Sequence, residues 1–150
     1  MITNNGTGRS IFLYWEEASG ELESLPTGVH GTIRPGVLYV PPPVGDLLAI
    51  EGIWDEANRE LGTMLDEHEE ESLQPEQARR LAELMSQRES QYRKRPADEV
   101  LRRAVADVVA PVQSTVWAEI TVKDVTRWMK EIAAFLSVAA QMGKVVVLSL

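Results

Sequence analysis

The sequence contains no cysteine, so it offers no disulfide, no thiolate nucleophile and no cysteine ligand for zinc or an iron–sulfur cluster. That absence is typical of proteins from a reducing compartment, and we expect a cytoplasmic protein. Histidine is almost as scarce, since His30 and His68 are the two in the chain. His30 lies among turn residues without a nearby Ser and Asp arrangement that would indicate a catalytic triad, so we interpret it as a surface residue.

Long apolar runs are missing as well. The longest nearly apolar run, Ile132–Ala140, spans nine residues, whereas a helix that crosses a bilayer needs about 20. Met1–Gly6 has no basic region leading into an apolar stretch, so we expect neither a secretory signal nor N-myristoylation. Basic residues are outnumbered by acidic ones, 15 to 23, and the formal charge of −8 argues against a nucleic acid or an anionic membrane as the partner.

What the chain does have is an ordinary globular composition with an uneven distribution of charge. Of its 150 residues 44% are apolar and 25% are charged, which fits one soluble domain. Between Asp46 and Glu76 there are eleven acidic residues and one basic residue, whereas between Arg79 and Arg103 there are eight basic and four acidic ones. Both stretches have helical patterns. We therefore expect a helical pair whose charges partly neutralise each other and leave an acidic surface for a basic partner.

The first forty residues predict a small antiparallel meander. Residues 1–9 are polar and glycine-rich, which is typical of a flexible arm. Aromatic and β-branched residues between turn signals then favour short strands. The extended segments over residues 10–41 are Ser10–Glu17, the short Glu21–Leu25, Val29–Ile33 and Val37–Val40.

The region 46–110 is predicted to be helical. Pro41–Pro43 cannot donate backbone hydrogen bonds and so ends the strand region. Apolar residues at three- and four-residue spacing predict a helix over Asp46–Glu71 with its first residue as the N-cap. Pro75 suits the first turn of a second helix, and a third is predicted over Ala97–Val109.

The region 114–150 has the order of a strand–helix–strand unit. A strand is expected over Ser114–Ile120, a helix over Thr121–Met142 and a strand over Lys144–Leu150. Two strands joined in this way in one sheet would be parallel with a right-handed crossover. Because the last strand is apolar on both faces, we expect it inside the sheet, beside Ser10–Glu17. The predicted fold class is α+β, a small and mostly antiparallel sheet built from the N-terminal meander plus the C-terminal strand and packed against about four helices.

No catalytic or metal-binding motif is complete. Gly6–Ser10 lacks the lysine and the spacing of a phosphate-binding loop and leads into a strand. The zinc-protease pattern that begins at His68 has Ser72 in place of its second histidine, and Leu65 occupies the glutamate position of a ferritin-like pair. Asp66–Glu71 would bind a divalent cation at most loosely, and a solvated helix end is the favoured interpretation. We therefore assign no catalytic residue, no metal and no cofactor.

Several segments resemble small bacterial proteins that act as immunity partners of polymorphic toxins. The segments are Ile53–Asn58 and Leu65–Leu73, together with the terminal helix, Gly143-Lys144 and the closing apolar strand. The resemblance implies a cytoplasmic, non-enzymatic protein that occludes the active site of a basic toxin domain, often with an acidic surface. It covers about half of the chain and carries over no individual functional residue.

Two functional hypotheses follow from the sequence. The first is a protein-binding module that meets a basic protein partner through an acidic patch, which consists of Glu67, Glu69, Glu70 and Glu71. The second is a small-ligand enzyme or sensor with a pocket between the sheet and the helices near Trp15, Tyr39 and Trp54. Core packing is the favoured interpretation of the four tryptophans in either case. Self-association is a third possibility, because the sequence leaves the oligomeric state open.

Overall fold

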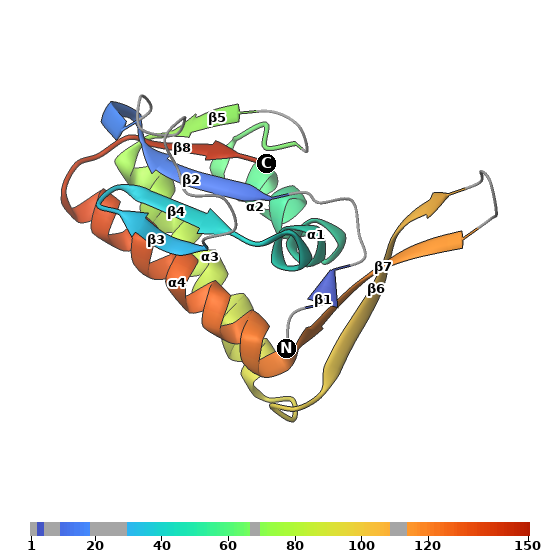
Figure 1. Ribbon diagram of the computed structural model, residues 1–150. Coiled ribbons are helices and arrows are strands. Elements are labelled where there is room, and N and C mark those ends of the chain that lie inside the picture. The colour runs from blue at the N-terminus through green and yellow to red at the C-terminus, as the bar shows by residue number, and fades with distance from the viewer. Residues whose placement is uncertain (1–2, 5–9, 19–29, 67–69, 109–113) are drawn as a thin grey trace.

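The protein is an α+β fold in which helices cover one face of a five-stranded antiparallel sheet (Figure 1). The computed structural model describes residues 3–4, 10–18, 30–66, 70–108 and 114–150. In spatial order the strands of this sheet are β3 (Gly31–Arg34), β4 (Val37–Val40), β2 (Ile11–Trp15), β8 (Val146–Ser149) and β5 (Glu70–Leu73). The predicted fold class is confirmed. The expected strand Glu21–Leu25 lies outside the described residues.

Two long helices form the layer beneath the sheet. α3 (Pro75–Arg93) and α4 (Val122–Gln141) run side by side along one face of the five strands (Figure 1). α4 begins as the sequence predicts, because the Thr121 hydroxyl accepts a hydrogen bond from the Asp124 backbone N–H at 3.2 Å. α3 begins at its proline, and the Gln74 N–H donates to the side chain of Gln77 at 2.9 Å.

The core lies between this sheet face and the helices. Side chains alternate along a strand, so Ile11 and Leu13 of β2 are buried against the helices while Phe12 and Tyr14 point to the other face. β8 lies inside the sheet, between β2 and β5, and buries three consecutive side chains. The expectation that this strand is interior and pairs with β2 is confirmed.

The predicted helix 46–71 is two helices, a loop and a strand. α1 (Pro42–Ile50) begins within the proline run, because proline is compatible with the first turn. The expected N-cap Asp46 is therefore inside α1, where it is buried. Gly52 adopts φ 74°, a left-handed conformation that breaks the helix before α2 (Ile53–Leu61). The chain then returns to the sheet as β5.

A second, three-stranded sheet replaces the predicted helix 97–109. Its order is β1 (Thr3–Asn4), β7 (Ser114–Thr121) and β6 (Val100–Val108). The helix prediction was wrong because pairing along the whole of β7 overrides the helical pattern, and it brings Leu101 opposite Ile120, both buried. Thr3 and Asn4 pair with β7, so this part of the expected flexible arm is a strand.

The predicted parallel strand–helix–strand unit is also wrong. β7 belongs to the three-stranded sheet and β8 to the five-stranded one, so α4 carries the chain from one sheet to the other. Every described strand pair is antiparallel.

Among the described residues, the expected attraction between the acidic and the basic stretch joins two helices through Arg88. Arg88 of α3 donates from Nε and Nη2 to the Glu56 carboxylate of α2, at 2.9 and 2.6 Å. Arg79, by contrast, pairs within its own helix with Glu76 and Glu83. Two of the basic residues in the Arg79–Arg103 stretch, Arg102 and Arg103, lie on β6 rather than on a helix.

Candidate functional site

β5 forms one margin of the five-stranded sheet and carries two of the predicted acidic residues, Glu70 and Glu71. It pairs with β8 in an uninterrupted register from Glu70 opposite Ser149 to Leu73 opposite Val146. In the strand order of the described residues, no strand lies on its other side. Figure 1 shows β5 at this edge. An edge strand in regular register can receive a further strand.

The opposite edge is built differently. β3 pairs with β4, but the register shifts between Thr32 and Arg34. Such an irregularity twists an edge away from further pairing, and Pro35, directly after the strand, cannot donate a backbone hydrogen bond. β5 is therefore the better of the two edges for strand addition.

The loop before β5 is held by the side chain of Asn58. Asn58 Nδ2 donates to the Leu65 carbonyl at 2.8 Å, and Oδ1 accepts from the Leu65 N–H at 2.7 Å and from the Thr63 hydroxyl at 2.8 Å. Between these anchors Met64 is 78% exposed. Its N–H donates to the Glu71 carboxylate at 2.9 Å, which ties the loop to β5. Glu71 thus has a local structural role, and Met64 presents an apolar side chain beside the strand.

Glu70 is exposed on β5, whereas Glu71 is partly buried. The Tyr14 hydroxyl donates to Glu70 Oε1 at 3.4 Å. Burial raises the pKa of Tyr14 above its usual value, and the negative charge and hydrogen bond of Glu70 raise it further. None of the ion pairs between described residues includes Glu70 or Glu71. Glu67 and Glu69, the other members of the predicted patch, lie outside the described residues.

The three residues of the alternative pocket are not brought together. Trp54 is 6% exposed and packs in the core from α2. Tyr39 stacks on Phe12 with ring centroids 4.3 Å apart, on the sheet face away from the helices. Its hydroxyl lies 2.8 Å from the Ser10 hydroxyl. Trp15 alone of the three is among the described residues that line a cavity between the β3–β4 hairpin and α4.

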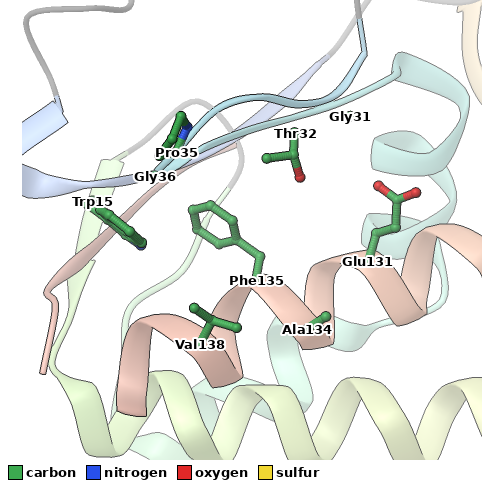
Figure 2. Close-up of a pocket in the computed structure, with 9 residues that line it drawn as sticks. All are labelled: Trp15, Gly31, Thr32, Pro35, Gly36, Glu131, Ala134, Phe135 and Val138. Carbon is green, nitrogen blue, oxygen red and sulfur yellow. The ribbon is translucent and has the colours of Figure 1, made fainter. Parts of the chain in front are cut away.

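A cavity of about 570 Å³ lies between the β3–β4 hairpin and α4, and we call it the β3–α4 cavity (Figure 2). On the sheet side Trp15, Thr32 and Pro35 contribute to it. On the helix side it is lined by Glu131, Ala134, Phe135 and Val138. These four positions are three and four residues apart, so they share one helix face. The sequence shows this spacing. It does not show that this face of α4 lies opposite the β3–β4 edge of the sheet.

Comparisons with known proteins give no relative for this chain: no family model matches it, nor does a curated protein or a solved structure at a significant level. Among the residues that the structure describes, no group of three or more His, Asp or Glu side chains is arranged to hold a metal ion. No helix in the described ranges has the length and apolar character needed to span a membrane. The site assignment therefore rests on the geometry of the edge and the cavity.

Proposed function

We propose that this chain is a small acidic protein-binding module that recognises a basic protein partner at the β5 edge. The observation that carries the proposal is the β5 margin itself, a strand in unbroken register with Glu70 exposed on it and Met64 exposed beside it. The module has no catalytic role in this proposal.

Backbone pairing would supply the affinity. A partner strand added to β5 would extend the sheet through main-chain hydrogen bonds, with side-chain contacts deciding specificity. Met64 suits such a contact, because an unbranched thioether adapts to the surface that it meets. Methionine is also enriched in interface cores.

Complementary charge would raise the rate of association with the partner. The chain carries a formal charge of −8, and complementary charges mainly raise the on-rate and the specificity of a complex. Glu70 adds to this at the edge, since no described cation pairs with it. The resemblance to immunity partners of polymorphic toxins fits this proposal, with a basic toxin domain as the protein that is occluded.

The test uses the products of the genes that flank this one. Each product is purified and its association with the immobilised full chain is followed by biolayer interferometry at about 50 and 150 mM salt, where screening lengths differ appreciably. We expect one of them to bind, with an on-rate that falls markedly at the higher salt. Absence of binding by every flanking product, or an on-rate insensitive to salt, would count against the proposal.

A matched pair of variants locates the surface. Glu70→Lys should slow association more than Asp98→Lys, although both change the net charge by the same amount. Asp98 is exposed in the turn between α3 and β6. Figure 1 shows this turn at the other end of the molecule from β5. Equal effects of the two variants would show that only the net charge matters and that the β5 edge is not the contact.

A further inference from the structure

We propose that the β3–α4 cavity binds a small organic cation, an ammonium group joined to an apolar body of aryl or alkyl character. The cavity lies at the β3 side of the sheet, across the strand order from β5. This proposal therefore stands apart from the proposed protein-binding function, and either can fail without the other. Its volume of about 570 Å³ is within the range of small-molecule sites.

One end of the cavity is polar and negatively charged. Figure 2 shows the Glu131 carboxylate beside the rim, with the Thr32 side chain directed to the same side of the cavity. A Cβ built on Gly31 would lie 4.0 Å from Glu131 Oε2, so the backbone of β3 passes close to this carboxylate. Of the described residues that line the cavity, Glu131 is the charged one.

The carboxylate of Glu131 is available to a cationic ligand. Its ion pair with Arg127 is long, 3.8 Å, and both side chains are substantially exposed. Exposed pairs of this kind, four residues apart on one helix, contribute little free energy. An ammonium group that enters the cavity can therefore bind Glu131 while Arg127 turns to solvent. The overall charge of −8 also favours a cation over an anion.

The other end of the cavity is apolar. Trp15, Pro35, Phe135 and Val138 surround it, and Val138 is 48% exposed. An aryl or alkyl body placed there would remove this apolar surface from water. An aromatic ring attracts a cation through its face, so an ammonium group placed near Phe135 would gain from this ring as well as from Glu131.

The wall formed by Trp15 is fixed in place by Gly36. Gly36 has φ 83°, and a Cβ built on it would lie 2.6 Å from Trp15 Cε3. The bare backbone therefore rests directly on the indole ring, which any larger residue would displace. A wall that is already in position lowers the ordering cost of binding a ligand.

The test compares three probes with one body: 4-phenylbutylamine, 4-phenylbutanol and 4-phenylbutyrate. Binding is followed in nitrogen–proton NMR spectra of the full chain through the Trp15 indole signal, which the Trp15→Phe variant assigns. We expect the amine to shift this signal saturably and to bind about tenfold more tightly than the alcohol, with the carboxylate weakest, because only the amine pairs with Glu131. Equal affinity of the amine and the alcohol, or no shift with the amine, would overturn the proposal.

A matched pair of variants identifies the charged group. Glu131→Gln should remove the preference for the amine over the alcohol, whereas Glu83→Gln should keep it. Glu83 makes the same kind of ion pair, four residues from Arg79, but on α3 and outside the described lining of the cavity. A preference that survives Glu131→Gln would exclude Glu131 as the ammonium partner. Glu70→Lys should leave amine binding unchanged, which separates this result from the test of the β5 edge.

Discussion

The two sheets of this protein are held in different ways. The five-stranded sheet has α3 and α4 along one face and keeps its C-terminal strand, β8, in the interior between β2 and β5. The three-stranded sheet packs against α1 near the base of β6 and β7, and the far halves of these two strands stand away from the helices (Figure 1). Burial of apolar side chains on both faces stabilises β8 as a strand. For β6, the stabilising contact is the pairing with β7.

The junction between the sheets is polar. Glu51, just after α1, accepts hydrogen bonds from two arginines: Arg103 Nε of β6 donates to its carboxylate at 2.9 Å, and Arg88 Nη1 of α3 donates to its carbonyl at 3.1 Å. Tyr92 of α3 is buried beside them and hydrogen-bonds to Glu51. Glu51 thus links the C-terminal end of α1 to α3 and to the three-stranded sheet. Three regions are thus held differently: the core of the first sheet, this junction, and the projecting hairpin formed by the far halves of β6 and β7.

The largest effect is expected from deleting residues 145–150, which removes β8. Val146, Val147 and Leu148 are buried, and each such side chain contributes about 1.5–3 kcal/mol. The deletion also leaves β2 and β5 without their shared neighbour. The sum is comparable with the whole stability of a typical domain, about 5–15 kcal/mol. The truncated chain should therefore fail to fold, as far-UV circular dichroism would show, and a soluble product that melts cooperatively would contradict the central role of β8.

A smaller effect is expected at the junction, from Arg88→Gln. The Arg88 side chain is partly buried and makes three hydrogen bonds, two of them to the Glu56 carboxylate. Hydrogen bonds to charged groups contribute about 1.5–3 kcal/mol, so we expect a loss of about 2–3 kcal/mol in urea unfolding. Arg79→Gln is the control, because its exposed pairs lie within α3 and should contribute below about 0.5 kcal/mol. Equal losses would mean that Arg88 does not join the helices.

Local sequence signals determine some parts of this fold and leave others undetermined. α3 and α4 were predictable because their starts are encoded nearby, by Pro75 and by Thr121. β8 was predictable from an apolar run that needs cover on both faces. The break at Gly52 and the strand β6 were not, because a left-handed residue and a distant partner strand leave little local signal.

The candidate site was likewise predictable only in part: its residues could be indicated from the sequence, but their surroundings could not. The acidic run pointed to Glu70 and Glu71, but it was interpreted as the end of a helix. Their place on an edge strand follows from pairing with β8, which lies far along the chain. The cavity residues Glu131 and Phe135 share a helix face, but the opposing hairpin is set by tertiary packing. In both cases charge and periodicity in the sequence indicated the side chains of interest. Which part of the protein lies beside them is determined by contacts between segments far apart in the chain.

The pH dependence of stability probes the junction with Tyr92. The pKa of Tyr92 is raised from 10.0 to about 12, chiefly by burial and in smaller part by the nearby charge and hydrogen bond of Glu51. The folded protein then keeps this phenol protonated while the unfolded chain ionises it. The stabilisation is complete below pH 10 and is lost as the pH rises from about 10 to 12. Urea unfolding at pH 9 and 11 should show a smaller alkaline loss for Tyr92→Phe than for the unchanged chain, and equal losses would contradict the raised pKa.

The smallest effect is expected from shortening the projecting hairpin. Ala104 and Trp117 are directly opposite each other, so residues 105–116 can be replaced by Asn-Gly, which favours a two-residue turn between paired strands. The pairing of Leu101 with Ile120 and the contact of Arg102 with the Trp117 ring, 4.0 Å from its centroid, remain. A two-stranded hairpin by itself is marginally stable at best, so its removal should change the free energy of unfolding by no more than about 1 kcal/mol. Urea unfolding measures this directly. A loss above about 3 kcal/mol would exceed what a two-stranded hairpin contributes by itself, and the distal strands would then have to be part of the cooperative fold like β8.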